Sequence, residues 1–465
     1  MDTRHSRALI TVVVLCFGGL SASLTQTLVI PIQGELPQLL STSASNAGWV
    51  VTITLLAAAV TMPISGRLGD LFGKPVVLIT SAGVLAVGSV VCALSSTLTP
   101  MLVGRGLQGL AMGFIPVAIA LIREVVPPEM ANTGIAAMSA TLGVGGAIGL
   151  PLAAWVVQTF DFHALFWMAA GFAVLLLVGL LTLVPRPRDA QGGRVDLVGA
   201  VGLALGLVAV LLGVSKGREW GWTDGRTLGA LVVGVVVLLV WAVFELGQDE
   251  PLVDLRATAR RPVLLTNVAA VAIGFGMMAQ AIVVPQLLQA PVETGYGLGQ
   301  TILEAGLWMA PGGLMMLVFA PVSSRLMTSV GPRLTLALGA GVLGVGYLVA
   351  FFLMDAPWQL LVASVVASSG VGIGYAAMPA LIMGSTPPSE AGSALGVNAL
   401  MRSVGTTVAS AVMATILAGS TGRSGFELCF AIGAGAAFVG VVITLLVPHV
   451  HQRAGAVAEP ASARA

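Results

Sequence analysis

The sequence predicts an all-α polytopic membrane protein, and three observations support this prediction. Of its 465 residues, 57% are hydrophobic and only 9% are charged, whereas an ordinary soluble domain is roughly a quarter charged. The mean hydropathy is strongly positive, at +0.99. The apolar residues are also grouped into fourteen runs that are each long enough to cross a bilayer. We therefore expect fourteen transmembrane helices, arranged as two six-helix bundles plus two extra helices.

The fourteen runs are joined by mostly short connections, which leave no room for a soluble catalytic domain. A spanning helix needs about 20 mostly apolar residues. On that rule the first six spans fall at about 8–32, 47–65, 76–95, 98–122, 133–158 and 164–185. Two more fall at about 197–215 and 227–245, and the last six at about 263–288, 302–322, 333–354, 358–382, 391–418 and 426–447.

A short internal repeat divides these spans into two halves. Pro63–Leu68, after span two, has a counterpart in Pro321–Leu326, after span ten, and Gly73 then matches Gly331. The offset of eight spans suggests that two spans are inserted between two six-helix halves, and paired halves are a transporter architecture. The predicted units are 1–188 (N-terminal bundle), 189–262 (two linking helices), 263–448 (C-terminal bundle) and 449–465 (a disordered cytoplasmic tail).

The distribution of Lys and Arg predicts the orientation, because cytoplasmic loops carry more of these residues. With the amino terminus inside, the inner loops and tails hold fifteen Lys and Arg residues, and the outer loops hold only four. The remaining two, Arg105 and Arg402, fall within spans. We predict a protein of the cytoplasmic (plasma) membrane with both termini in the cytoplasm.

Three stretches resemble signatures of the major facilitator superfamily. Gly66–Lys74, a polar loop between spans two and three, is similar to its loop signature, glycine-x-leucine-x-aspartate-x-x-glycine-basic. Leu102–Gly109 resembles its fourth-helix signature, in which an arginine is followed by glutamine-glycine. Gly145–Pro151 resembles its antiporter signature, except that Leu150 interrupts the glycine-proline pair.

The number of spans narrows this resemblance to the fourteen-helix drug:proton antiporter family, as do Glu219–Trp222 and Pro251–Leu255. Membership would imply export of drugs, antiseptics or a producer's own antibiotics in exchange for protons. The proton gradient would then be the energy source, with no cofactor.

Polar residues within the spans are the candidates for a substrate and proton pathway. Arg105 lies about seven residues into span four, and a cation at that depth is costly unless it faces water or a partner. It either contacts substrate in a central cavity or serves as a hydrogen-bond hub that holds helix four to helix one. Further candidates are Gln26, Gln108, Asn267, Gln280, Asn398 and Arg402.

The proton carrier is the open question, because the stretch Leu24–Leu28 of span one contains no carboxyl group. Gln26 can hydrogen-bond a substrate but cannot carry a proton. Glu304, near the outer end of span ten, is the best remaining acid close to the membrane. Burial would make it a usable carrier near neutral pH, and the alternative is a solvated acid in a loop.

Two further groups of residues are candidates for conformational roles. The polar loop with Gly66, Arg67, Asp70, Gly73 and Lys74 could form a cytoplasmic latch that is made in one state and broken in the other. Arg123 is the expected partner of Asp70, and the alternative is that the basic residues only set topology. Gly145, Gly149 and Pro151 make span five thin on one face, which suits either a hinge or ordinary close packing.

We considered three functions. The first is a proton-coupled exporter of hydrophobic or amphipathic compounds, and the alternative is a facilitator or importer of a small metabolite on the same fold. An embedded enzyme is disfavoured, because the four His residues lie at ends or in loops and the three Cys residues lack metal-like spacing. We expect a monomer that meets a small hydrophobic substrate and the lipid bilayer, with no metal and no nucleic acid.

Overall fold

The computed structural model describes residues 3–30, 32–33, 35–186, 192–387, 390–420 and 422–448. Within this part, fourteen helical spans are long and apolar enough to cross a membrane. The predicted number of spans and the all-helical fold are therefore confirmed. The predicted tail 449–465, and the predicted boundary between the first bundle and the linking helices at 188, lie outside the described residues.

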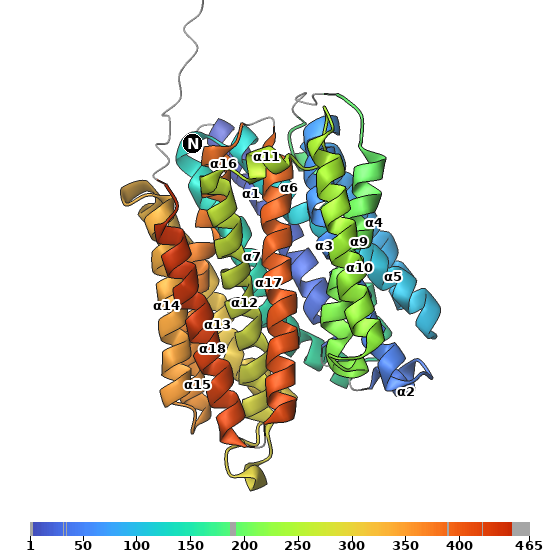
Figure 1. Ribbon diagram of the computed structural model, residues 1–465, viewed down its shortest axis with the longest axis vertical. Coiled ribbons are helices and arrows are strands. Elements are labelled where there is room, and N and C mark those ends of the chain that lie inside the picture. Colours follow the sequence, from blue (N-terminus) through green and yellow to red (C-terminus); the bar gives the residue numbers. More distant parts are fainter. Residues whose placement is uncertain are drawn as a thin grey trace, which may run out of the picture.

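The N-terminal bundle contains six spans, one of which is divided by a short 3-10 turn at Ala111–Gly113. Its helices are α1 (Thr3–Thr27), α3 (Ala44–Phe72), α4 (Lys74–Ala93), α5 (Leu98–Leu110) with α6 (Phe114–Val125), α7 (Pro128–Thr159) and α8 (His163–Leu183). A single turn, α2 (Leu36–Leu39), lies in the first connection. We call the face at which α1 begins the N-face, and the other the opposite face (Figure 1).

The C-terminal bundle also contains six spans, one of which is interrupted at Ala376. Its helices are α12 (Arg261–Gln289), α13 (Ile302–Ser329), α14 (Pro332–Phe352), α15 (Pro357–Tyr375) with α16 (Ala377–Ser385), α17 (Ala391–Gly419) and α18 (Arg423–Leu445). The inserted pair is α9 (Leu197–Trp220) and α10 (Gly225–Leu246). Two short helices, α11 (Leu255–Thr258) and the 3-10 turn Val292–Thr294, lie in connections.

Two pairs of helices bring the bundles together: α3 packs against α17, and α7 packs against α13. Small residues allow the second pair to approach closely, since a methyl group added to Gly313 would overlap Ala147. A methyl group added to Gly143 would likewise overlap Met316. Within lipid, helices associate through such close packing rather than through a hydrophobic force.

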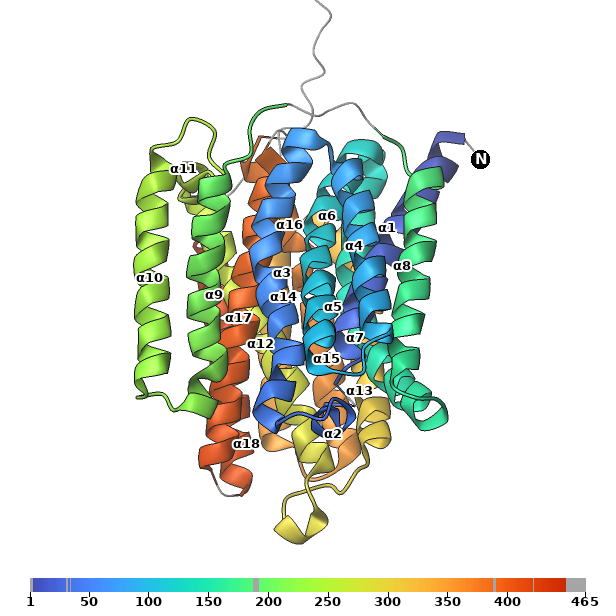
Figure 2. The ribbon, with the colours of Figure 1, turned by 90° about the vertical axis from the view of Figure 1, so that its right-hand side faces the viewer.

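The inserted helix α9 lies against both bundles at the α3–α17 contact (Figure 2). Leu203, Leu207 and Leu211 follow one another at helical spacing on α9, and all three are buried. They share an apolar cluster with Leu56 of α3 and Leu400 of α17. Helix α10 packs on the outer side of α9 and faces lipid.

The structure corrects the prediction of a polar loop at Gly66–Lys74. Helix α3 continues to Phe72, and α4 begins at Lys74. The turn is Gly73 alone, which has a φ of 93° that favours glycine. Its repeat partner Gly331 has a φ of 86° and also precedes a helix with proline in its first turn. The polar residues therefore extend two helices beyond the hydrocarbon instead of forming a flexible loop.

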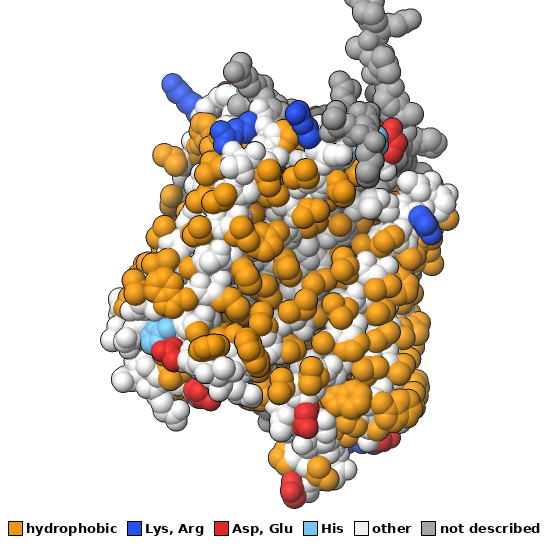
Figure 3. All heavy atoms as spheres, turned by 180° about the vertical axis from the view of Figure 1, so that it is seen from behind, with side chains coloured by type: hydrophobic (Ala, Val, Ile, Leu, Met, Phe, Trp, Pro, Cys, Tyr) orange, Lys and Arg blue, Asp and Glu red, His pale blue; other side chains and the backbone are white. Residues whose placement is uncertain are grey.

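Apolar side chains cover the sides of the molecule, as a surface in contact with lipid requires. Helix α10 shows this most clearly, because its Leu239, Val240 and Val243 are each more than 60% exposed. Figure 3 shows hydrophobic side chains over most of one side, with Lys and Arg near the N-face end. The chain is therefore a multi-pass membrane protein.

The α3–α17 contact generates a first prediction. A methyl group added to Gly66 would overlap the carbonyl oxygen of Gly392, whereas nothing lies within 4 Å of the same position at Gly83. Overpacking of this kind costs about 1–3 kcal/mol. We expect Gly66→Ala to lower the thermal unfolding midpoint in detergent, measured by tryptophan fluorescence, and Gly83→Ala to leave it unchanged. Equal midpoints for the two variants would contradict the close contact.

Candidate functional site

The contact between Asp70 and the start of α17 joins the two bundles at the N-face. The Asp70 carboxylate accepts hydrogen bonds from the backbone N–H groups of Gly392 and Ser393, at 3.1 and 2.8 Å. These N–H groups belong to the first turn of α17, where a helix leaves its donors unpaired and carries partial positive charge. Asp70 is only 2% exposed. One buried carboxylate of the first bundle therefore caps a helix of the second.

Glycines let this contact form by bringing the two backbones together. Gly66 lies one turn before Asp70 and faces Gly392. A methyl group on either glycine would overlap the backbone of the other helix. One turn further along α17, a methyl group on Gly396 would overlap the Met62 carbonyl oxygen. The N-face ends of α3 and α17 are thus closed over at least two helical turns.

Lys74 supports Asp70 from the first turn of α4. Its Nζ atom lies 3.7 Å from Asp70 Oδ1, and it also forms an ion pair with Glu124 near the end of α6. Both Asp70 and Lys74 are buried. The pairing with Glu124 connects α6 to the Asp70 contact.

The two other basic residues expected at this site take no part in its ion pairs. Arg67 is half-buried and Arg123 is exposed. In the described part of the chain neither forms an ion pair. We expected Arg123 to pair with Asp70. In the structure Lys74 is the basic partner of Asp70, and Lys74 pairs in turn with Glu124. Arg123 and Glu124 point in different directions because they are adjacent on a helix.

Arg105 lies in α5 as a hydrogen-bond hub. Its guanidinium donates to the carbonyl oxygens of Val50 on α3 and Thr25 on α1, at 3.1 and 3.0 Å. It also donates to Gln108 Oε1 at 2.6 Å, and Gln108 in turn donates to Ser89 of α4 at 2.9 Å. Arg105 is 1% exposed. This geometry matches the alternative in which Arg105 holds helix four to helix one.

Apart from Glu304, the other predicted pathway residues fall in two separate places. Gln26 follows Thr25 on α1 and is half-buried. Asn398 and Arg402 lie one turn apart on α17, where Asn398 donates to Asn267 of α12 at 3.0 Å. The Arg402 guanidinium lies over the ring of Tyr375, 4.4 Å from its centroid. The structure thus groups Asn398 and Arg402 in the C-terminal bundle, away from Arg105.

Glu304 lies at the start of α13 as part of a capping box. Its carboxylate accepts from the Thr301 backbone N–H at 2.8 Å, and the Glu304 N–H donates to the Thr301 hydroxyl at 3.2 Å. The side chain is exposed. This is the solvated alternative that the sequence left open, because the residue begins the helix instead of facing its interior.

The predicted hinge residues lie on two different faces of helix α7. Gly145 and Gly149 face Ser23 and Thr27 of α1, and the Thr27 hydroxyl donates to the Gly145 carbonyl oxygen at 3.3 Å. Pro151 faces the other bundle, near Gly306 of α13. The three predicted hinge residues thus lie where α7 meets α1 on one side and α13 on the other.

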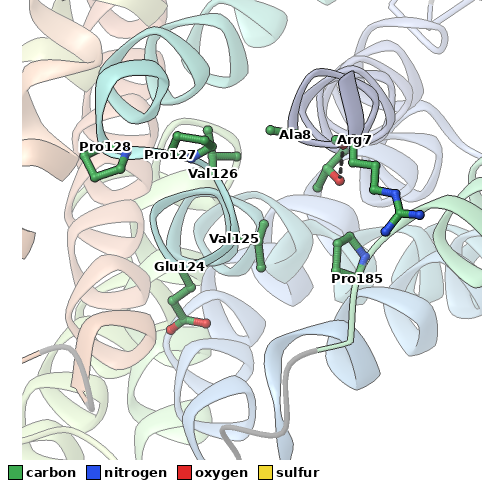
Figure 4. Close-up of a pocket in the computed structure, with 9 residues that line it drawn as sticks. Arg7, Ala8, Glu124, Val125, Val126, Pro127, Pro128 and Pro185 are labelled. Carbon is green, nitrogen blue, oxygen red and sulfur yellow. Dashed lines mark hydrogen bonds between the residues drawn. The ribbon is translucent and has the colours of Figure 1, made fainter. Parts of the chain in front are cut away.

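A pocket of about 420 Å³ opens at the N-face between α1, α6 and the start of α7. Figure 4 shows Arg7 and Glu124 on different sides of the pocket, with the Arg7 side chain extending away from Glu124. Pro127, Pro128 and Pro185 contribute to its wall. None of the predicted pathway residues lines this pocket, so it lies apart from the path suggested by the sequence.

Three groups at these sites were missed by the sequence analysis. Backbone N–H groups such as those of Gly392 and Ser393 leave no signal in a sequence. Glu124 was not considered because the adjacent Arg123 was the expected partner of Asp70. An acid at the end of a span is itself an indication of a possible ion pair. Tyr375 lies within the predicted apolar span at 358–382, and no sequence pattern indicates that its ring lies under Arg402.

Comparison with known proteins places this geometry in context. The family model of the Major Facilitator Superfamily matches residues 15–409 and 266–464. A multidrug transporter protein of Bacillus subtilis, MdtP, is 23% identical over 89% of this chain and 75% of its own length. The tetracenomycin C resistance and export protein of Streptomyces glaucescens is 28% identical over 89% of this chain and 76% of its own.

The share of a relative that this chain covers varies, from 58% of an uncharacterised Mycobacterium tuberculosis transporter to 97% of an uncharacterised Bacillus subtilis transporter. Among solved structures, the human organic anion transporter MFSD10 (TETRAN) superposes with a TM-score of 0.68 at 16% identity. The alignment covers 96% of this chain and 100% of that one. At this identity the likeness shows the fold alone.

The Arg105 hub generates a prediction about stability. Replacing Arg105 by Met removes the donors of three buried oxygen atoms, at a cost of about 1–3 kcal/mol for each unsatisfied group. We expect Arg105→Met to lower the thermal midpoint strongly and Arg105→Lys to lower it less. The exposed Arg226 supplies the matched control, Arg226→Met. An unchanged midpoint with lost transport would assign Arg105 to the substrate path instead.

The Asp70 contact generates a prediction about opening. Asp70→Asn removes the negative charge at the start of α17. This lowers the free energy needed to separate the bundles at the N-face by about 1–2 kcal/mol. The population with the N-face open should then rise roughly tenfold. The reporter is Ser324→Cys in a background without the three native cysteines, because Ser324 hydrogen-bonds to Thr133 across the bundles. We expect faster labelling by a maleimide with Asp70→Asn, but not with Arg67→Gln. Equal rates would show that the contact does not hold the bundles closed.

Proposed function

The chain belongs to the Major Facilitator Superfamily and is a transporter rather than an enzyme; on this premise we propose that it exports hydrophobic or amphipathic compounds, drugs or antibiotics among them. Export across the cytoplasmic membrane would proceed by alternating access in exchange for protons. The relatives that are named for multidrug transport and for tetracenomycin C export support the direction and the class of cargo.

The observation that carries the alternating-access part of the proposal is the Asp70 contact. Asp70 belongs to one bundle and the N–H groups of Gly392 and Ser393 to the other, so the contact must break when the bundles separate at the N-face. We propose that the N-face is cytoplasmic and that this conformation is closed toward the cytoplasm. The concentration of basic residues near the N-face supports this orientation (Figure 3).

We propose that protons act on the same contact. In the part of the chain that the structure describes, Asp70 is the acid that directly hydrogen-bonds the backbone of the opposite bundle. A proton on its carboxylate would remove the charge that favours the start of α17. Proton uptake would then weaken the closed state, and proton release would restore it.

Transport in everted vesicles tests the proposal. The cytoplasmic face of these vesicles is outside, so an acidic lumen should drive uptake of a hydrophobic fluorescent dye, and a protonophore should abolish that uptake. We expect Asp70→Asn to lower the initial rate by about tenfold while dye binding to the purified protein changes little. Vesicles that contain Gly83→Ala serve as the control for expression and insertion.

Three outcomes would overturn parts of this proposal. Accumulation that persists after collapse of the pH gradient would exclude proton antiport for that dye. Uptake by right-side-out vesicles, with none by everted ones, would favour the alternative of a metabolite importer or facilitator. Equal loss of binding and transport in Asp70→Asn would move Asp70 from gating to the substrate site.

A further inference from the structure

The two buried arginines of the spans differ in how their charge is accommodated. Arg105 donates to three oxygen atoms in its own bundle. Arg402 is 8% exposed, and its guanidinium lies over the Tyr375 ring and also hydrogen-bonds the Tyr375 side chain. Among the described residues Arg402 forms no ion pair. An aromatic face attracts a cation but cannot neutralise it.

Arg402 also lies at a depth where the described part of the chain offers no acid. It is the twelfth residue of α17, which places it roughly 17 Å from the N-face end of that helix. The described Asp and Glu residues lie in connections or within about one turn of a helix end. A cation at such depth without a counter-charge is costly, and residues of this kind mark substrate or ion pathways.

Asn267 of α12 provides a second, independent observation, because it hydrogen-bonds the residue one turn before Arg402. Asn267 is 3% exposed, and its Oδ1 atom accepts from Asn398, which lies one turn before Arg402. Its Nδ2 atom is buried and has no hydrogen-bond partner. A buried amide donor without a partner is costly and rare. Asn267 therefore offers a free donor close to Asn398.

The packing of α12 on α17 holds these donors together. A methyl group on Gly274 would overlap the Arg402 carbonyl oxygen, so the two helices touch at this level. Long side chains on a helix lean toward its N-terminus, which directs Arg402 toward the turn that carries Asn398. Tyr375 lies at the end of α15, just before the break at Ala376, and supports the guanidinium from the other side.

We propose that Arg402 and Asn267 form a binding site for an anionic oxygen of the exported compound, with Tyr375 as a positioning residue. The cargo would be a hydrophobic organic acid that carries a carboxylate or a phenolate. This ligand supplies the counter-charge that Arg402 lacks and the acceptor that Asn267 lacks. The inference rests on the proposed function and specifies its substrate class.

A matched set of fluorescent probes tests the site directly. Pyrenebutyrate is an anion, pyrenebutanol is neutral and pyrenebutylamine is a cation, while all three carry the same apolar ring and chain. Binding to the purified full-length protein is measured by fluorescence anisotropy at neutral pH in chloride-free buffer. We expect pyrenebutyrate to bind at least about tenfold more tightly than pyrenebutanol, and pyrenebutylamine to bind most weakly.

Variants connect that preference to the proposed residues. Arg402→Gln should reduce the preference for the anion to less than about twofold, and Arg402→Lys should retain part of it. Asn267→Ala should weaken pyrenebutyrate without changing pyrenebutanol, and it keeps the test valid if Arg402→Gln does not fold. Arg423→Gln is the control, because Arg423 is exposed and pairs with Asp355 and Glu427 at the opposite face.

The outcomes separate this inference from the proposed function. A preference for the anion that survives in both Arg402→Gln and Asn267→Ala would overturn the inference. Saturable chloride binding with no discrimination between pyrenebutyrate and pyrenebutanol would also overturn it, because the site would then hold an inorganic counter-ion. Export of all three probes at equal rates would leave the proposed function intact and exclude the anion site. Selective binding of pyrenebutyrate without its export would support the anion site and contradict the proposed export function.

Discussion

A single buried carboxylate makes the closed arrangement of this protein depend on charge. Asp70 accepts from the first N–H groups of α17, and it can do so only because Gly66 and Gly392 allow the two helices to touch. Lys74 lies beside it and extends the contact to Glu124 on α6. A charge at a helix N-terminus contributes up to about 2 kcal/mol, which is enough to bias a conformational equilibrium between the two bundles.

Much of the fold could be predicted from hydropathy, because each span must satisfy its own backbone in lipid. The internal repeat predicted an inserted pair of helices, and its glycines Gly73 and Gly331 have similar positive φ angles, 93° and 86°. Helix ends were harder to predict. Helix α3 continues beyond the apolar stretch because Asp70 is satisfied by a distant helix, and no local pattern reports that.

The candidate site was predictable only in part. Asp70 and Arg105 could be singled out because charge near or within a span is rare, yet their partners are mainly backbone groups. Backbone donors and acceptors have no sequence signature. Glu304 shows the opposite case: the same sequence neighbourhood suits a membrane acid and a helix cap, and the hydrogen bonds to Thr301 distinguish them.

The inserted helix α9 presents its leucines to α3 and α17 at once, so it must part from at least one of them when the bundles separate. In water such a step would be opposed by exposure of apolar surface. In a bilayer, acyl chains replace the departing leucines, so little hydrophobic penalty arises. The mechanical resistance to the motion then comes from the few polar attachments at the ends of the pair, such as that of Trp222 to Thr415 and that of Ser393 to Leu252. If the bundles separate as proposed, we expect α9 to move over the α3–α17 contact at little cost, and we expect the rate of separation to depend on the lipid composition.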